Sequence, residues 1–469
     1  MLLGQTKLKA ITDYIIRVSL GTETEVLVFA DESALTRFAN NQIHQNVAVQ
    51  NLVLQVRVLI GKKQGVASAN LAVGNWPLAN GKNLILNPII KKKLADLVDQ
   101  AFQIAKLSPA DPVFSHLPGK TEGVFIYPKV NAYSENTATS DPVFRAKRVG
   151  EIIKKARSHK LNAFGSLSGG VYEIVVANSH GVFAYHEYTQ GLLNIRIMGD
   201  ASTGYAGEID TDVTKINFAT ATERAISKTL LGAKSTAVKP GTFDVILEEP
   251  CVSEMMTYLS YLGFGGRAFQ EDRSFLSGNL NKKVMGKNIT IWDDATSKNN
   301  LSIQFDFQGM PKKKIVLIEK GIAKNVLYDQ YLAQKYQTKQ TGHRYPAPGA
   351  EDAYAGHLFL APGSTPRNQL LKGMKRGILV SRFWYVRNVH PKELSITGMT
   401  RDGTFLVENG EVVSGVNNMR FTISIPKILS QVSHLSQETR LEPSDEGFGA
   451  SRLPAIRAKG FTFTGVSKL

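Results

Sequence analysis

Two segments of this chain begin with the same helix-opening pair, a capping side chain followed directly by proline. The pairs are Asn87-Pro88 and Asp141-Pro142. The cap satisfies a free N–H at the helix start, and proline fits the first helical position because no donor is needed there. Apolar residues then recur at helical spacing, which predicts two amphipathic helices, each with one face to bury.

Strand patterns surround these helices. Residues 51–60 alternate between apolar and polar side chains, and GKKQG at 61–65 predicts a hairpin turn. An opening helix is predicted near 8–20 and another helix at 217–231. Further strands are predicted at 25–30, 162–167, 171–177, 182–186 and 193–198.

The last part of the chain, from about residue 239, reads as short strands with a few helices and frequent glycine and proline. Such a pattern is typical of a β-rich domain with long crossing loops. The predicted class is α+β, with an N-terminal α/β domain (1–125), a central α/β domain (126–236) and a β-rich C-terminal domain (237–469).

The composition is that of a globular protein with two or three domains: 469 residues, 43% hydrophobic and 20% charged. Cys251 is the single cysteine, which excludes an intramolecular disulfide and a cysteine-cluster zinc site. The N-terminus is too polar for a signal peptide, and no apolar run reaches the roughly 20 residues of a membrane span. We therefore expect a cytoplasmic protein with no membrane association.

The formal net charge of +16 raises the question of a nucleic-acid partner. The lysines and arginines are scattered, and no zinc-finger, RRM or KH signature accompanies them. A solvated basic surface or an acidic partner is favoured over nucleic acid.

The segment VILEEPCVSE, residues 245–254, joins an apolar run to a helix pattern. Glu248, Glu249 and Glu254 could form a general acid/base pair whose crowding raises one pKa. The favoured interpretation is that the first two acids meet the positive end of the helix dipole. Cys251 could be a nucleophile, but no histidine is near in sequence, so a buried structural thiol is favoured.

Several stretches resemble the signature segments of the TldD/PmbA (TldD/TldE) metalloprotease family, in the same order over most of the chain. They are RFANNQIHQN (37–46), VRVLIGKKQGVAS (56–68), VANSHGV (176–182), the segment 305–343, GILVSRFW (377–384) and FLVENGEVVSGVNNMRF (405–421). The resemblance implies the α/β, α/β and β-rich architecture given above. It also implies paired subunits that enclose a chamber, with zinc bound in the catalytic type by the two histidines of HExxxH and a distant cysteine.

This chain departs from that pattern at every ligand. Glu248 stands at the first histidine, Glu249 at the glutamate and Ser253 at the second histidine, and no cysteine follows Cys251. Zinc needs three protein ligands and an open position. The chain therefore resembles the TldE/PmbA-type subunit, and no cofactor is expected in it, while zinc is expected in a catalytic partner.

The same resemblance suggests roles for other residues. Arg37, Asn41 and His44 match the N-terminal signature and are expected to be structural or to line the chamber. His343 lies in a segment similar to the family's loop that faces the active site. Together with the three glutamates above, it completes the set of catalytic candidates.

The leading hypothesis is a non-catalytic subunit of a cytoplasmic metalloprotease that degrades or processes unfolded peptides. Its partner would be an HExxxH-bearing TldD-type subunit in a heterodimer, or a second copy in a homodimer. One alternative is a self-sufficient metallopeptidase or hydrolase that uses Glu249 with an atypical site. A second is a basic binding protein for an acidic partner or nucleic acid.

Overall fold

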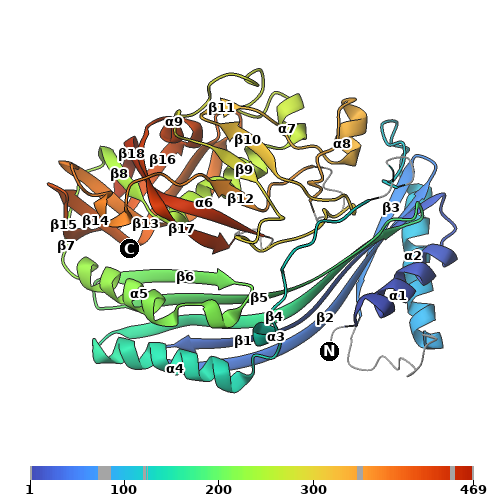
Figure 1. Ribbon diagram of the computed structural model, residues 1–469, viewed down its shortest axis with the longest axis horizontal. Coiled ribbons are helices and arrows are strands. Elements are labelled where there is room, and N and C mark those ends of the chain that lie inside the picture. The colour runs from blue at the N-terminus through green and yellow to red at the C-terminus, as the bar shows by residue number, and fades with distance from the viewer. Residues whose placement is uncertain are drawn as a thin grey trace.

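The computed structural model describes residues 3–71, 86–119, 123, 125–345, 352–443 and 449–466. Within these residues the strands form two sheets, one of six strands and one of twelve. Figure 1 shows the long strands of the six-stranded sheet curving beneath a β-rich body made by the C-terminal half of the chain. The α+β class with a β-rich C-terminal region is confirmed.

The six-stranded sheet is antiparallel throughout, in the order β3-β2-β1-β4-β5-β6. The predicted regions 1–125 and 126–236 each contribute consecutive strands, so the boundary at residue 125 falls between strands of one continuous sheet. The strands are β1 (Glu23–Ala39), β2 (Gln42–Ile60), β3 (Lys63–Asn70), β4 (Asn162–Asn178), β5 (Phe183–Met198) and β6 (Thr203–Asp210).

Strands β4 and β5 correct the sequence-based prediction, which divided each of them in two. Gly170 and Gly191 lie between the predicted pieces, and each allows another segment to pack closely against a continuous strand. A Cβ on Gly170 would lie 2.7 Å from the Cβ of Ser33, and one on Gly191 would lie 2.9 Å from the Cβ of Val213. Glycine in a strand often marks such an approach rather than an end.

The helix-opening pairs work as predicted. The Asn87 side chain accepts a hydrogen bond from the Ile89 N–H at 2.7 Å, and that of Asp141 accepts one from the Phe144 N–H at 2.6 Å. Helices α1 (Gln5–Val18) and α2 (Pro88–Leu107) pack at one end of the sheet, and α4 and α5 pack at the other. The remaining bounds here are α3 (Glu135–Ala138), α4 (Pro142–Ser158) and α5 (Phe218–Gly232).

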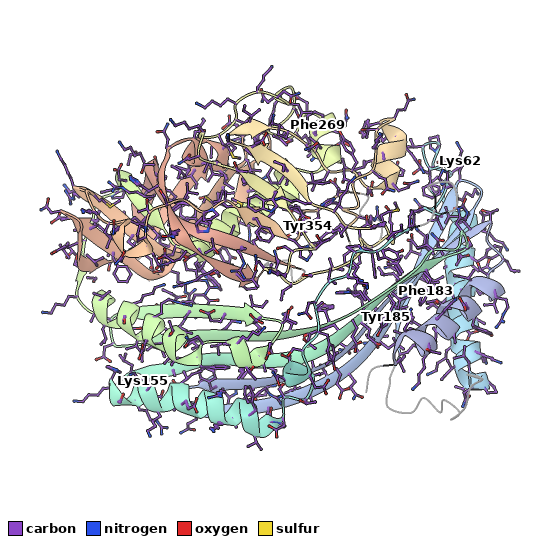
Figure 2. The ribbon with its side chains drawn as sticks, viewed as in Figure 1. Lys62, Lys155, Phe183, Tyr185, Phe269 and Tyr354 are labelled. Carbon is purple, nitrogen blue, oxygen red and sulfur yellow. The ribbon has the colours of Figure 1, made fainter. Side chains whose placement is uncertain are left out.

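Period-two alternation gives this sheet two buried faces. Val26 and Val28 of β1 pack into the α1/α2 core, whereas Leu27 packs against the loop that carries Phe305 and Phe307. Figure 2 shows Phe183 and Tyr185 of β5 near the α1 end, and Lys155 projecting outward from α4. The face that carries Leu27 holds the β-rich body on the sheet, because apolar side chains from both are buried there.

In the β-rich body, β8 (Gly241–Leu247) lies between β13 (Arg376–His390), which is parallel to it, and β18 (Ala450–Val466), which is antiparallel. The other strands are β7 (Ser235–Thr236), β9 (Ile291–Asp293), β10 (Ile315–Glu319), β11 (Ile322–Ala323), β12 (Leu358–Leu360), β14 (Ser395–Glu408), β15 (Glu411–Val416), β16 (Met419–Ser424) and β17 (Val432–Pro443). The helices are α6 (Glu249–Tyr258), α7 (Gly266–Gln270), α8 (Gln330–Lys335) and α9 (Ile425–Ser430).

No helix in the described part of the chain is long and apolar enough to cross a membrane.

Candidate functional site

Helix α6 begins where the central strand β8 ends. The backbone N–H of Glu248, at the N-cap, donates to the carbonyl of Val380 on β13 at 3.0 Å, which fixes the junction against the neighbouring strand. Pro250 lies in the first turn, where a missing N–H donor costs nothing. The apolar side of the helix, with Val252 and Met255, is fully buried in the β-rich core.

The two glutamates at this junction are held by cations from distant segments. Glu248 Oε1 accepts from Arg367 Nη2 at 2.9 Å, and its other oxygen pairs with Lys228 of α5. Glu249 pairs with the Arg367 Nη1 group, and Arg440 of β17 lies 3.9 Å from its second oxygen. Arg367 thus bridges both carboxylates.

This pairing fixes the charge of Glu248. Burial by itself would raise its pKa, but Lys228 and Arg367 outweigh burial and lower the pKa from 4.5 to about 2. A carboxylate that stays ionised and engaged by two cations cannot take up a proton near neutral pH. Glu248 therefore acts as an ionised anchor, and the general acid/base arrangement considered from sequence does not form there.

Glu248, Glu249, Lys228, Arg367 and Arg440 form an ion cluster that extends to the six-stranded sheet. Glu442 of β17 is buried, and burial followed by repulsion from Glu249 raises its pKa to about 8. Arg224 of α5 pairs with Glu208 of β6 at 2.9 Å, and its charge acts on Glu442 from the sheet side. The cluster thus lies where the β-rich body meets α5 and β6.

The zinc site implied by the resemblance does not fit these residues. Glu248 and Glu249 are occupied by Arg367 and Lys228, and the Ser253 hydroxyl donates to the Pro443 carbonyl at 3.5 Å. A cation placed among these groups would be repelled by the guanidinium of Arg367, which contacts both carboxylates. Among the residues that the structure describes, no group of three or more His, Cys, Asp or Glu side chains is arranged to hold a metal ion.

Cys251 is the buried structural thiol favoured from sequence. Its side chain is fully buried and its Sγ–H donates to the Val380 carbonyl at 3.4 Å. Burial, and next the negative charge of Glu248, raise the pKa of this thiol well above its usual value. The thiol therefore stays protonated and unreactive.

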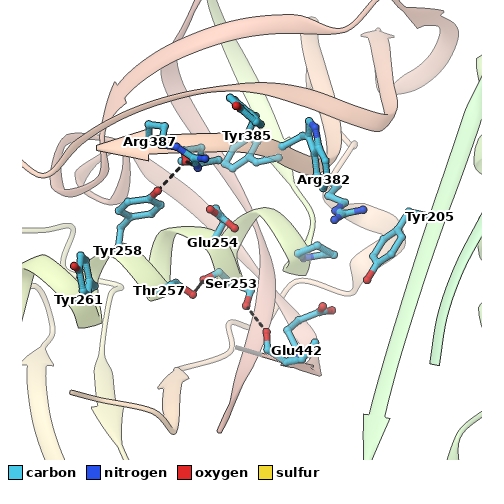
Figure 3. Close-up of a pocket in the computed structure, with 15 residues that line it drawn as sticks. Tyr205, Ser253, Glu254, Thr257, Tyr258, Tyr261, Arg382, Tyr385, Arg387 and Glu442 are labelled. Atoms are coloured by element: carbon cyan, nitrogen blue, oxygen red, sulfur yellow. Dashed lines mark hydrogen bonds between the residues drawn. The ribbon is translucent and has the colours of Figure 1, made fainter. Parts of the chain in front are cut away.

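A cavity of about 490 Å³ opens beside α6, between the helix and β13. Figure 3 shows the helix side chains on one wall and the β13 side chains on the opposite wall, with Tyr205 of β6 at one end. The residues that line it include Ser253, Glu254, Thr257, Tyr258 and Tyr261 from the helical side, Arg382, Trp384, Tyr385 and Arg387 from β13, and Tyr205 and Glu442.

A bulge in β13 shapes this wall. Trp384 pairs with Met399 and Arg387 with Thr397, so Tyr385 and Val386 together face one residue of β14. Tyr385 has φ of 55°, a left-handed conformation that turns its ring outward, where it is 68% exposed. Bulges commonly re-aim side chains at functional sites. Here the bulge places Tyr385 at the cavity wall.

The sequence-based candidates separate in space. Glu254 lines the cavity, whereas Glu248 and Glu249 belong to the ion cluster at the helix start. His343 is fully buried elsewhere: its Nε2 lies 3.0 Å from Asp293 Oδ1, and its Nδ1 lies 2.9 Å from the Thr341 carbonyl. Burial, and next the charge of Lys312, lower the pKa of His343. Its ring is a buried bridge between Asp293, at the end of β9, and the backbone at Thr341.

Arg37, Asn41 and His44 lie around the β1–β2 hairpin turn. Asn41 has φ of 60°, and its side chain donates to the Leu161 carbonyl at 3.0 Å and accepts from the Ala163 N–H at 2.8 Å. Arg37 and His44 are exposed. Strands β4 and β5 separate this hairpin from β6, where Tyr205 borders the cavity, so the role seen for Asn41 is to fasten the turn to β4.

Sequence reasoning missed the cations that hold the junction. Lys228, Arg367 and Arg440 lie in separate segments, and no local pattern connects them to residues 248 and 249. The one available signal was the pair of adjacent glutamates after a buried strand, because buried acids need partners.

Two family models match the chain. One, described as the PmbA/TldA metallopeptidase central domain, covers residues 135–232, and the other, the PmbA/TldA metallopeptidase C-terminal domain, covers residues 240–465. Among curated proteins, a "Metalloprotease TldD homolog" of Buchnera aphidicola (subsp. Schizaphis graminum) is 25% identical over 358 residues, which is 70% of each chain.

Solved structures share the fold over nearly the whole chain. TldE from Thermococcus kodakarensis superposes with a TM-score of 0.83 at 20% identity, covering 98% of this chain and all of that one. A putative modulator of a DNA gyrase from Thermotoga maritima superposes with a TM-score of 0.81 at 16% identity, covering 97% of this chain and all of that one.

Proposed function

The chain belongs to the PmbA/TldD metallopeptidase family, and from this we propose that it is the non-catalytic, TldE/PmbA-type subunit of a cytoplasmic metalloprotease complex. It pairs with an HExxxH-bearing TldD-type subunit, which holds the zinc, and it helps to bind unfolded peptides for cleavage. A homodimer is the alternative assembly.

The observation that carries this proposal is the ion cluster at the start of α6. The positions aligned with the family's first histidine and glutamate hold Glu248 and Glu249, and Arg367 bridges both. A zinc peptidase needs an open coordination position and a carboxylate free to accept a proton from water. The guanidinium of Arg367 instead supplies positive charge at this junction, without an open position.

The cavity beside α6 suits an extended peptide. Aromatic rings of Tyr261, Trp384 and Tyr385 are exposed along it, and such rings offer large contact area at low entropic cost. These features support binding by this subunit, while the partner performs the cleavage.

The test is to purify the chain alone and as a complex with a co-expressed HExxxH-bearing family member. Zinc per chain and cleavage of an unfolded peptide are measured in both preparations. We expect zinc and activity in the complex only. Stoichiometric zinc together with peptidase activity in the isolated chain would show that the chain is itself the enzyme.

A matched pair of variants sharpens the result. Complexes that still assemble with Glu249→Gln in this chain are expected to remain active, because loss of the Glu249–Arg367 pair lowers stability and removes no group that takes part in cleavage. The Glu→Gln change in the partner's HExxxH motif is expected to abolish cleavage. Assembly of both variants is checked by size-exclusion chromatography, so that loss of the complex is not mistaken for loss of chemistry.

A further inference from the structure

Three arginines converge on one buried carboxylate at the Tyr205 end of the cavity. Arg196 Nη2 lies 3.0 Å and Arg382 Nη1 lies 3.3 Å from Asp402 Oδ2, and Arg401 Nε lies 4.0 Å from Oδ1. The Asp402 side chain is fully buried, and it also accepts from the Thr203 hydroxyl at 2.8 Å. Three guanidinium groups and one carboxylate leave these side chains with a net charge of +2.

The arrangement leaves the cations repelling one another. Burial, and next the charge of Arg196, lower the pKa of Arg401, with Arg382 adding to the effect and Asp402 opposing it. Like charges at close range disfavour the charged form of each, and an added anion relieves that repulsion.

Aromatic rings hold the guanidinium planes in place. The Trp384 ring has the Arg401 Cζ 4.6 Å from its centroid and the Arg382 Cζ 5.1 Å from it, and Arg382 also lies 4.4 Å from the Tyr205 ring. Stacking fixes the faces of a guanidinium while its N–H edges stay available. The side chains of Arg196, Arg382 and Arg401 remain 29%, 24% and 36% exposed.

Of the four charged side chains in this Asp402 cluster, Arg382 lines the cavity, at one end. Arg382 and Tyr205 line the end shown on the right of Figure 3, while Tyr258 and Tyr261 lie at the other. Trp384 also lines the cavity and stacks on Arg382. Arg401 and Asp402 also border a neighbouring cavity of about 420 Å³, which Asp200 lines as well. A peptide between α6 and β13 would therefore meet concentrated positive charge where it reaches Arg382.

We propose that Arg382, with Arg196 and Arg401, forms a carboxylate-binding subsite that takes a carboxylate of a peptide lying in the cavity. The proposal rests on the peptide-binding role proposed above and adds a preferred position for the peptide's carboxylate within the cavity. Arginine matches a carboxylate through paired N–H donors, which makes it the residue suited to such recognition. The free C-terminus of a peptide and an acidic side chain both supply this group.

The experiment uses three fluorescent peptides of one neutral, unstructured sequence, binding to the full chain and to its complex. One has a free C-terminus, one is C-terminally amidated, and one is amidated with a glutamate as its last residue. Loss of a charge-assisted contact is expected to weaken binding of the neutral amide by about tenfold relative to the free acid. The glutamate peptide distinguishes a side-chain carboxylate from the terminal one.

Arg382→Gln is expected to abolish the preference for carboxylate. Arg387→Gln is the matched control, because Arg387 also lines the cavity and stacks on Tyr385, 4.7 Å from its ring, but stands outside the Asp402 cluster. It is expected to keep the preference ratio.

Equal binding of all three peptides to the wild-type chain would overturn the subsite and leave the peptide-binding role intact. A preference that survives Arg382→Gln would likewise overturn the assignment. Failure of every peptide to bind either preparation would overturn the peptide-binding role and the subsite together. The comparison of free acid with amide needs no variant, so a misfolded Arg382→Gln protein does not block the test.

Discussion

Replacing Arg367 with glutamine is expected to destabilise the fold strongly, because this side chain bridges two buried carboxylates. Glu249 is fully buried and would keep only Arg440, 3.9 Å away, while Glu248 would keep Lys228. Removing one partner of a buried ion pair costs about 3–5 kcal/mol, since the remaining charge is left without compensation. Urea unfolding followed by tryptophan fluorescence measures the loss.

The matched control is Arg376→Gln. Arg376 pairs with Glu408 at 3.5 Å, but the two side chains are 63% and 43% exposed. Exposed pairs contribute about 0–1 kcal/mol, so this variant should unfold close to the wild type. If Arg367→Gln also unfolds at the wild-type urea concentration, the ion cluster does not stabilise the junction as described.

The pH dependence gives a second check on the same variant. The pKa of Glu248 is about 2 in the folded chain against 4.5 in the unfolded chain. A lowered carboxyl pKa contributes stability that is complete above the unfolded value and is lost as the pH falls toward the folded value. The difference between wild type and Arg367→Gln is therefore expected to be largest near neutral pH and to narrow below about pH 4.5.

Three further predictions address other parts of the structure. The pKa of Glu442 is raised from 4.5 to about 8, so its contribution to stability is complete at low pH and is lost as the pH rises through this range. The melting temperature should therefore fall between these pH values, and Glu442→Gln should make the fall smaller. A melting temperature that depends on pH in the same way in both proteins would refute the shift. Cys251 should react with a thiol reagent only after denaturation, because it is fully buried and its thiol pKa is raised; rapid modification of the native chain would contradict this. Asn41→Ala should lower the free energy of unfolding by about 1–2 kcal/mol, because it removes the hydrogen bonds that fasten the hairpin turn. His44 is exposed, so His44→Ala should leave the melting temperature nearly unchanged in the same experiment.

Local patterns in the sequence were enough to predict elements whose determinants are themselves local. Asn87 and Asp141 cap helices as expected, because a cap and its N–H partner are only two or three residues apart. The β-rich C-terminal half likewise follows from its strand patterns. The continuity of β4 and β5 was not predicted. The close packing of Gly170 against Ser33 and of Gly191 against Val213 involves other segments of the chain.

The candidate site could be predicted only in part, because most of its contacts join segments that are distant in sequence. The pair Glu248 and Glu249 marked the junction, but their partner Arg367 is more than a hundred residues away in sequence. The bulge that exposes Tyr385 depends on register with β14, which no single strand pattern specifies. The arginines around Asp402 come from two sheets and meet only in the folded chain.

We propose that this chain has exchanged metal chemistry for an internal ion cluster and acts with a zinc-bearing partner. The most direct measurement is zinc per subunit in the purified complex, with the subunits separated and analysed individually alongside peptide cleavage. We predict one zinc in the HExxxH-bearing subunit, none in this chain, and cleavage by the complex alone. Zinc bound stoichiometrically to this chain, with cleavage in the absence of a partner, would contradict the claim.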